Sequence, residues 1–292
     1  MVFSTLRTIA TAATLLLPVL AAAQANPTLD KILARGQIVI GHRTASPPLG
    51  YVADNGQVTG YSVEVCKYAA EHIKAALKRP DLKVAFVPVD ASNRIPLVQN
   101  GTIDMECAGT SNTIERQKVV GFTYNILYIE TRIAVRKSGP VRSAADLKGR
   151  SVAVMQGTVQ QKLLAELDRA RGLGVKPVLA RDTAEGFLLL ETGRADAAIN
   201  DSLMLASSIH KSREAADFVF LPDWSSPPDV VSIMIAKGDD RFRTLANEGI
   251  RKMMSTGEFE KNYNRFFMAA PYMLPMPEPL RQQMRQPNDT GI

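Results

Sequence analysis

The sequence predicts an α/β protein made of two lobes that follow one scheme. First, apolar segments with the spacing of strands alternate along the chain with segments that have the spacing of helices. Second, this alternation stops at Gly139-Pro140 and then starts again. Third, residues 97–104 and 189–196 share a pattern, in which a helix end, a glycine and an aspartate precede an apolar strand. Chance similarity is the alternative explanation of this short echo.

The first half of the chain alternates between expected strands and helices. Residues 62–78 have apolar side chains at helical spacing, and Pro80 follows them. Gly101 closes a short helix over 94–100, and a further helix is expected to begin near Asn112, with Glu115 as its capping partner. The strands of this half are expected over 37–41, 83–89, 102–108 and 128–136.

The second half repeats this order of elements. Helices are expected over 159–171, 187–191, 242–254 and 258–267. Strands are expected over 151–155, 195–199, 218–221 and 230–236. The tail from Pro271 carries Pro271, Pro275, Pro277 and Pro279 and is expected to be extended, since proline interrupts a helix. Strands that alternate with helices are typical of mostly parallel sheets.

The N-terminus has the pattern of a secretory signal peptide. Arg7 is the only charged residue before Asp30, an apolar stretch covers 9–20, and three alanines end at Ala23. The apolar stretch is too short to span a bilayer comfortably, and no cysteine stands at the cleavage point to carry a lipid. We therefore expect residues 1–23 to be a cleaved signal peptide and the mature protein to be periplasmic.

The composition is that of an ordinary globular protein. Apolar residues make up 46% and charged residues 22% of the chain, which excludes a disordered or collagen-like chain. The 35 Lys and Arg exceed the 29 Asp and Glu, but the basic residues are spread over the whole chain. Nucleic-acid binding is therefore not expected, because its footprint is a cluster of basic residues.

The chain contains two cysteines, Cys66 and Cys107. An even number of cysteines in an exported protein favours a disulfide, which would remove conformational entropy from the unfolded chain. Two separate buried thiols are the alternative. Neither cysteine lies in a recognisable nucleophile motif, so catalysis by either is not expected.

No motif of an enzyme, a metal site or a cofactor site is present, and the three histidines are scattered. The distinctive feature is instead arginine at the ends of elements: Arg43 follows the first strand, and Arg94 and Arg116 lie in the first turns of helices. A guanidinium holds a carboxylate through two parallel hydrogen bonds. With Asp201 as a partner for an ammonium, these residues describe a ligand with two carboxylates and one amine. Surface salt bridges are the alternative for each arginine taken alone.

Ordered motifs along the chain resemble the periplasmic solute-binding proteins of polar amino-acid ABC transporters (family 3), and most of all the glutamate/aspartate-binding members. The motifs that carry the resemblance are Thr28-Leu29-Asp30-Lys31-Ile32, Val39-Ile40-Gly41-His42-Arg43, Gly60-Tyr61-Ser62, Asn93-Arg94-Ile95-Pro96-Leu97, Gln99-Asn100-Gly101-Thr102, Glu106-Cys107, Glu115-Arg116-Gln117-Lys118, Asp146-Leu147-Lys148-Gly149, Ser255-Thr256-Gly257-Glu258 and Gln286-Pro287-Asn288-Asp289. The resemblance implies a type II periplasmic-binding-protein fold, with two lobes joined by two hinge strands and the ligand in the cleft. Lobe 1 would be 26–130 plus 232–292, and lobe 2 would be 131–231.

The resemblance also implies roles for particular residues. Arg43 and Arg94 would hold the side-chain carboxylate of the ligand. Arg116, Ser111 and the Gly157-Thr158-Val159 turn would hold the α-carboxylate, and Asp201 the α-ammonium. Gly109, Thr110 and Thr183 complete the expected binding residues. The chain departs from the family pattern at Ala91, Gly109, Val159 and Thr183, where relatives carry other polar side chains. Each lost hydrogen bond is worth about 1 kcal/mol, which leaves glutamate, aspartate or another acidic solute open.

The expected function is delivery of glutamate or aspartate to an ABC-transporter permease of the inner membrane, by a monomer that is not an enzyme. Three alternatives stay open: binding of another carboxylate or polar amino acid for transport, a role in chemosensing, and a periplasmic dehydratase on the same fold.

Overall fold

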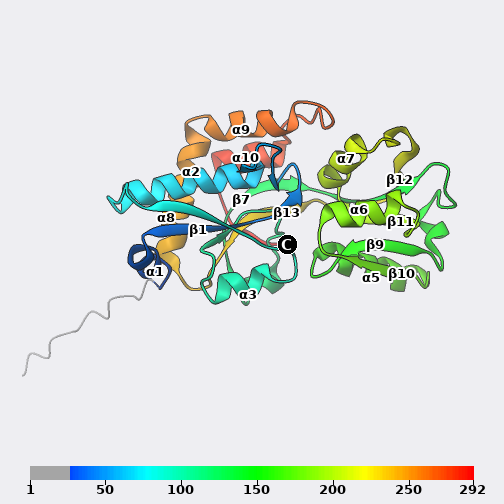
Figure 1. The fold of residues 1–292 in the computed structure, drawn as a ribbon, viewed down its shortest axis with the longest axis horizontal. Helices are drawn as coiled ribbons and strands as arrows, with labels where there is room; N and C mark the ends of the chain where they lie inside the picture. Colours follow the sequence, from blue (N-terminus) through cyan, green and yellow to red (C-terminus); the bar gives the residue numbers. More distant parts are fainter. Residues whose placement is uncertain (1–26) are drawn as a thin grey trace, which may run out of the picture.

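The computed structural model describes residues 27–292, which form two lobes side by side (Figure 1). The expected signal peptide, residues 1–23, lies outside the described residues. The sheet of lobe 1 has the strand order β5 (Lys83–Pro88), β1 (Gln37–His42), β6 (Met105–Glu106), β13 (Asp229–Ile235) and β7 (Gly121–Ile129). The sheet of lobe 2 has the order β10 (Lys176–Ala180), β9 (Ser151–Met155), β11 (Ala197–Asp201), β8 (Thr131–Arg136) and β12 (Phe218–Ser225). The expected two-lobed α/β architecture is confirmed.

The sequence pattern shared by residues 97–104 and 189–196 lies at equivalent places in the two lobes. Each segment leads from a helix, α3 (Arg94–Gln99) or α6 (Thr183–Glu191), into the middle strand of a sheet, β6 or β11. Asp104 Oδ2 accepts the backbone N–H of Val39 at 2.7 Å, and Asp196 Oδ2 accepts that of Ser151 at 2.9 Å. Both aspartates therefore satisfy a backbone donor of the neighbouring strand, β1 in one lobe and β9 in the other.

The expectation of mostly parallel sheets is wrong. β1 is parallel to β5 and β6, and β9 is parallel to β10 and β11. However, β13 is antiparallel to β6 and β7, and β8 is antiparallel to β11 and β12. The chain leaves lobe 1 along β7 and returns along β13, so these neighbouring strands must run in opposite directions.

Two segments of the chain connect the lobes. Glu130 separates β7 from β8, and residues 226–228 separate β12 from β13. The two segments are hydrogen-bonded to each other, since Thr131 N–H donates to Ser226 Oγ at 2.9 Å and Ser226 N–H donates to Thr131 O at 3.1 Å. The single strand expected over 128–136 is wrong, because a continuous run of strand-forming residues does not show where the pairing partners change.

Lobe 1 has a large core between its sheet and the helices α2 (Tyr61–Ala76), α8 (Asp240–Ser255) and α9 (Glu258–Phe267). α2 and α8 approach closely, since a Cβ on Gly249 would lie 2.9 Å from Ala69 Cα. Tyr61 is fully buried, with its ring among the aromatic side chains of α9, and its hydroxyl donates to Ile126 O at 2.6 Å. The core therefore joins segments from both ends of the chain.

Cys66 and Cys107 form a disulfide, as expected. Their Cα atoms are 6.3 Å apart. Cys66 lies in α2 and Cys107 directly follows β6. The bond therefore anchors the start of the loop at 108–111 to the core of lobe 1.

Lobe 2 places helices on both faces of its sheet. One apolar cluster lies against α5 (Val159–Arg171), and a second lies against α6 and α7 (Ser202–Lys211). α5 matches the range expected for it. α6 begins four residues earlier than expected, because the Asp182 side chain caps it by accepting the Glu185 N–H at 2.9 Å.

The helix expected near Asn112 is α4 (Ile114–Gln117), and its expected cap is wrong. The cap is Thr113, whose side chain accepts the Arg116 N–H at 3.2 Å. Glu115 instead forms an ion pair with Lys162 of lobe 2. The amide of Asn112 donates to Asp289 O at 3.0 Å, so it holds the C-terminal segment.

The C-terminal segment contains a helix, α10 (Glu278–Arg285), so the expectation of an extended tail is wrong. Pro277 is the residue before the helix and Pro279 lies in its first turn. Proline is tolerated there because the first N–H groups of a helix have no partner within the helix. Leu280 and Gln283 are buried against lobe 1.

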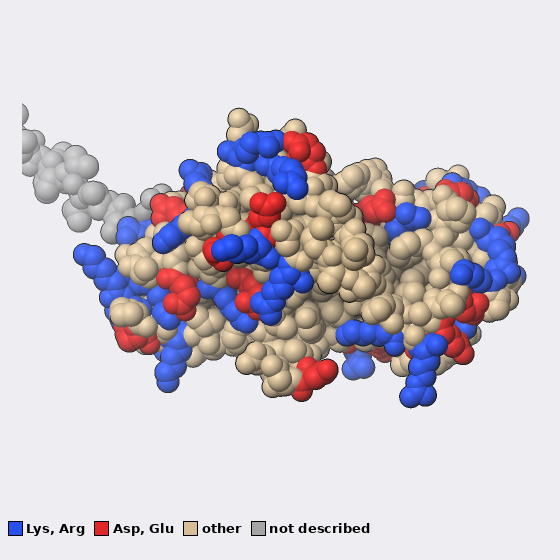
Figure 2. Space-filling model, turned by 90° about the horizontal axis from the view of Figure 1, so that it is seen from above, with Lys and Arg blue, Asp and Glu red and all other residues tan. Residues whose placement is uncertain are grey.

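Four further groups of elements had no counterpart in the sequence prediction: α1 (Pro27–Arg35), β10, α7, and a small sheet of β2 (Ala45–Ser46), β3 (Gly50–Val52) and β4 (Val58–Thr59). None of the helices in residues 27–292 has the length and apolar character that crossing a bilayer requires. On the face seen in Figure 2, basic and acidic side chains are interspersed, and the surface between the lobes is largely uncharged.

Candidate functional site

A narrow cavity lies between the lobes, at the carboxyl ends of β1, β6, β9 and β11. Ligands of open α/β sheets bind at this end of the strands. The cavity is lined by Arg43, Ser46, Arg94, Ala108, Gly109, Thr110, Ser111 and Arg116 of lobe 1 and by Met155, Thr158, Val159, Gln160, Asp201 and Met204 of lobe 2. Nine of the ten expected binding residues are thus brought together; Thr183 does not line the cavity.

The cavity measures about 20 Å³, which is room for about one water molecule. The lobes are therefore closed on each other. Side chains of lobe 1 contact lobe 2 directly: Arg94 Nη2 and Arg116 Nη2 donate to Gly157 O at 3.5 and 3.3 Å. A ligand the size of an amino acid fits only if the lobes or these side chains move apart.

Arg43 and Arg94 are charged side chains that are almost fully buried. Arg43 Nη2 donates to Arg181 O at 3.2 Å, across the cleft. Arg94 is the first residue of α3, where the backbone directs its side chain toward the cleft, and its Nε has no hydrogen-bond partner among the described residues. Burial lowers the pKa of both arginines, and their mutual repulsion lowers that of Arg43 further. Such guanidinium groups favour an incoming anion.

Arg116 and Ser111 form the opposite end of the lobe 1 wall. Arg116 Nη1 donates to Ser111 O at 2.9 Å, which fixes the guanidinium beside the loop after β6. Burial and the charge of Arg94 lower the pKa of Arg116 to about 10. Ser111 Oγ donates to Asp229 Oδ2. Asp229 lies at the start of β13, and burial raises its pKa to about 6.

The wall of lobe 2 contains the N-terminus of α5 and the end of β11. Thr158 caps α5 by accepting the Gln161 N–H at 3.3 Å, and Val159 is the first helical residue. The free N–H groups of a helix N-terminus attract anions. Asp201 is the last residue of β11, and its Oδ1 accepts the side-chain amide of Gln160 at 2.7 Å. Burial raises the pKa of Asp201 to about 8, and the charge of Asp229 adds to the rise.

Gly109 and Thr110 permit the lobes to come close. A Cβ on Gly109 would lie 2.7 Å from Leu49 Cδ1 and 2.8 Å from Met204 Cε, so a larger side chain would have to displace the ends of these two side chains. Thr110 O accepts the Ser232 N–H at 3.2 Å, which joins the loop after β6 to β13.

Thr183 lies behind the cavity wall and forms a polar contact between the lobes. Its Oγ1 is 3.2 Å from Ser46 Oγ of lobe 1, and it accepts the Asn200 amide at 3.3 Å. It also lies 3.4 Å from Met204 Sδ.

Five residues of the cavity wall were not expected as binding residues: Ser46, Ala108, Met155, Gln160 and Met204. The buried carboxylates Glu106 and Asp229 beside the cavity were not expected either. A signal existed only for Gln160, which follows the turn at 157–159 and lies in the first turn of α5. The two methionines give no polar signal, and their direction depends on where β9 ends and where α7 begins.

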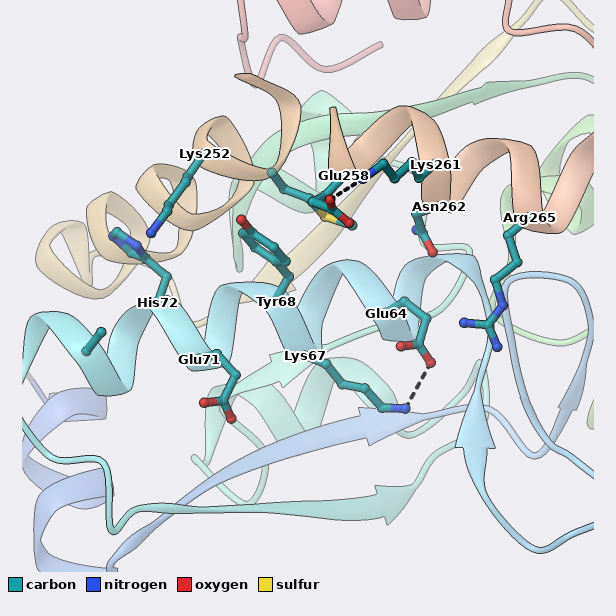
Figure 3. A pocket seen from close by; sticks show the side chains of 12 residues that line it. Glu64, Lys67, Tyr68, Glu71, His72, Lys252, Glu258, Lys261, Asn262 and Arg265 are labelled. Carbon is teal, nitrogen blue, oxygen red and sulfur yellow. Dashed lines mark hydrogen bonds and ion pairs between the residues drawn. The ribbon is translucent and has the colours of Figure 1, made fainter. Parts of the chain in front are cut away.

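A wider groove lies elsewhere, on the outside of lobe 1 between α2, α8 and α9 (Figure 3). Two ion pairs form within it: Lys67 Nζ is 2.9 Å from Glu64 Oε1, and Lys261 Nζ is 2.7 Å from Glu258 Oε1. Charged groups at such an open surface are screened by water and offer a ligand little. The cavity between the lobes is therefore the better candidate.

The chain is similar to proteins of known class. The family model of bacterial extracellular solute-binding proteins, family 3, matches residues 38–269. The chain is 35% identical to the glutamate/aspartate import solute-binding protein of Salmonella typhimurium, over 92% of this chain and 90% of that protein. It is 34% identical to the L-glutamate/L-aspartate-binding protein of Pseudomonas aeruginosa, over 98% and 96%.

A solved structure of a mutant of the arginine-binding protein from T. maritima has the same fold. The TM-score is 0.72 at 26% identity, and the match covers 83% of this chain and all of that one. The two-lobed architecture and the sequence match agree across most of the chain. The chain belongs to family 3 of the bacterial extracellular solute-binding proteins.

Proposed function

We propose that this protein binds an acidic amino acid, L-glutamate or L-aspartate, between its lobes and delivers it to an ABC permease. The observation that carries the proposal is the set of three arginines, Arg43, Arg94 and Arg116, that faces Asp201 across a buried cavity. Three cations and one anion complement two carboxylates and one ammonium. The names of the Salmonella and Pseudomonas relatives support the same ligand class.

In this proposal Arg43 and Arg94 hold the side-chain carboxylate of the ligand. Both are buried on the lobe 1 wall. Across the cleft, Arg43 Nη2 donates to Arg181 O at 3.2 Å and lies 3.8 Å from Met155 Sδ, and Arg94 Nη2 donates to Gly157 O at 3.5 Å. A carboxylate would replace these carbonyl oxygens with charged acceptors, which form stronger hydrogen bonds.

The α-carboxylate of the ligand lies between Arg116, Ser111 and the N-terminus of α5 at Thr158 and Val159. The α-ammonium meets Asp201. Because Asp201 and the α5 terminus belong to lobe 2 while the arginines belong to lobe 1, the ligand connects the lobes. Such a ligand favours the closed state in proportion to its greater affinity for it. The ligand is released unchanged, so the protein acts by binding and not by catalysis.

We propose that the hinge lies at Glu130 and at 226–228. Because Asp229, Val230 and Val231 pair with β7, lobe 1 then comprises 26–130 plus 229–292, and lobe 2 ends before β13 instead of at the expected residue 231. We further propose that the protein works in the periplasm as a monomer, after cleavage near Ala23, and that a membrane permease receives its closed form.

Isothermal titration of protein that has been unfolded, dialysed and refolded tests the ligand assignment. L-Glutamate and L-aspartate should bind, and L-glutamine and L-asparagine should bind roughly 100-fold more weakly, because each loses charged hydrogen bonds to two arginines. The variants Arg43→Met and Arg116→Met keep most of the side-chain length and should lose binding of the acids by a similar factor.

Arg181→Met is the matched control. The Arg181 side chain lies at the cleft rim but is 84% exposed and pairs with Glu185, so its loss should leave affinity unchanged. If the acids give no heat and a neutral amino acid or a dicarboxylate without an amine binds instead, the proposed ligand class is wrong.

A further inference from the structure

A carboxylate that the proposed binding scheme does not use is buried beside the three arginines. Glu106 ends the short strand β6 and has no exposed surface. Neither of its carboxylate oxygens has a hydrogen-bond partner among residues 27–292. A buried carboxylate without hydrogen bonds is costly, so opposite charges nearby are needed to keep it there.

The strand register shows which side of the sheet Glu106 faces. Its neighbours Met105 and Cys107 belong to the apolar core under α2, so Glu106 faces the opposite side. Its pairing partner on β13 is Met234, which belongs to the cluster under α3. α3 begins with Arg94. Glu106 therefore lies behind the arginines, on the side of the sheet from which Arg94 projects.

The charge of Glu106 favours the protonated form of all three arginines. Burial lowers the pKa of Arg94 most, and the charge of Glu106 is the first influence that raises it again. The charge of Glu106 likewise raises the pKa of Arg43 and of Arg116, against the lowering by burial and by Arg94. Among residues 27–292, Glu106 is the one acidic side chain whose charge raises the pKa of all three arginines, and it does not line the cavity.

We propose that Glu106 is a built-in counter-ion that positions the arginine cluster in the empty site and lowers its affinity for ligands with two carboxylates. The proposal rests on the proposed function, in which the arginines bind those carboxylates. Without ligand, Glu106 partly neutralises three neighbouring cations that would otherwise repel each other. With ligand, its charge repels the incoming carboxylates, so the complex is weaker than the arginines alone would make it.

A counter-ion of this kind makes two opposite predictions for Glu106→Gln, which keeps the size of the side chain and removes its charge. The unliganded variant should be less stable, with a lower midpoint of thermal unfolding, because the arginines lose their compensating charge. The variant should bind L-glutamate and L-aspartate more tightly, by roughly tenfold, because a nearby like charge is gone. Its affinity for L-glutamine should rise by a smaller factor, because the amide carries no side-chain charge.

The decisive measurement is the ratio of glutamate to glutamine affinity, determined by isothermal titration in wild type, Glu106→Gln and Asp104→Asn. Asp104 is the matched control. It is buried two residues earlier, but it pairs with Arg35 and with the backbone of β1 away from the cavity. Asp104→Asn should lower stability and leave the ratio unchanged, as any purely structural change would. Glu106→Asp keeps the charge but withdraws it by one methylene, so it should shift the ratio in the same direction by a smaller factor.

A ratio in Glu106→Gln that is unchanged or lower, or an unfolding midpoint that is unchanged or higher, overturns the proposal. If Glu106→Gln does not fold, the ratio in Glu106→Asp decides in its place. Failure of the proposed function is separate: it appears as wild-type protein that binds neither acid. In that case the unfolding midpoints of the unliganded variants still decide whether Glu106 stabilises the arginine cluster.

Discussion

The unliganded protein should become less stable as the pH rises from about 4 to about 8, and Asp201 should be the main cause. Burial, with the charge of Asp229, raises the pKa of Asp201 from 3.8 to about 8. Between these values the folded protein keeps a proton that the unfolded chain releases. Stability is therefore greatest at the acid end of this interval and is lost as the pH rises, which is opposite to the usual behaviour of a paired aspartate.

The two shifts give the size of the effect. A group with a pKa of about 8 when folded and 3.8 when unfolded loses about 2.5 kcal/mol of stabilisation between pH 5.5 and pH 7.5. Asp229, with a pKa raised by burial to about 6, loses about 0.8 kcal/mol over the same interval. Together, the two groups should therefore lower the free energy of unfolding by about 3 kcal/mol between pH 5.5 and pH 7.5, and Asp201 accounts for most of this loss.

Urea unfolding of ligand-free protein at pH 5.5, 6.5 and 7.5 measures this loss. Asp201→Asn has no carboxyl to titrate and should lose only about 1 kcal/mol across the interval, while Asp229→Asn should lose about 2.5 kcal/mol. Other titrating groups are common to all three proteins and cancel in the comparison. If Asp201→Asn shows the same pH dependence as wild type, Asp201 is ionised in the folded protein and the electrostatic description of the cavity is wrong.

Three further predictions concern the disulfide, a glycine and the proton of Asp201. Replacing Cys66 and Cys107 by alanine should lower the free energy of unfolding by about 4 kcal/mol, because the unfolded chain regains the entropy lost in closing a loop with a separation of 41 residues. Wild type in reductant should match the variant, and a loss under about 1 kcal/mol would contradict this prediction. Gly60→Ala should lower the free energy of unfolding in urea by about 3 kcal/mol, because φ is +131° and the new Cβ would lie 2.5 Å from Leu49 O. Gly56→Ala, with φ +79° and open space around the new Cβ, should lower it by about 1 kcal/mol. Equal losses in the two variants would refute the steric argument. Binding of L-glutamate at pH 7 should release about 0.9 proton, since the ligand ammonium displaces the proton of Asp201, and titrations in phosphate and Tris should differ in heat accordingly; identical heats would show that Asp201 gives up no proton.

Local patterns were sufficient to predict most of the helices and the central strands. α2, α5 and α8 have an apolar side that recurs at helical spacing, and the repeated aspartates Asp104 and Asp196 mark equivalent strands of the two lobes. Strand direction was not predictable in the same way. Whether β13 runs with or against β6 depends on where the chain crosses between the lobes, and no residue near Glu130 signals that crossing.

The arginines, Asp201 and the turns at 109–111 and 158–159 were predictable from the sequence, whereas the methionines and the role of the buried carboxylates Glu106 and Asp229 were not. Arg43, Arg94 and Asp201 each stand at the end of an element, where side chains of an α/β protein point toward a cleft. Met155 and Met204 look like core residues in the sequence, and only the closure of the lobes brings them into the cavity. Glu106 belongs to the Glu106-Cys107 motif of the sequence. Its role depends on the side of β6 that it faces, and the strand register decides that side.

The strand order of lobe 1 constrains the sequence of folding events as the chain emerges into the proposed periplasmic location, where disulfides form. β1, β5, β6 and β7 emerge early, but β13 lies between β6 and β7 and follows the whole of lobe 2 in the chain. Lobe 2, formed by one continuous stretch, can complete its sheet first, while the nascent lobe 1 keeps two strand edges unpaired. Such edges attract other chains. The partners of the disulfide, Cys66 and Cys107, both emerge before this interval. An early covalent link can therefore hold α2 against β6 and limit aggregation until β13 arrives.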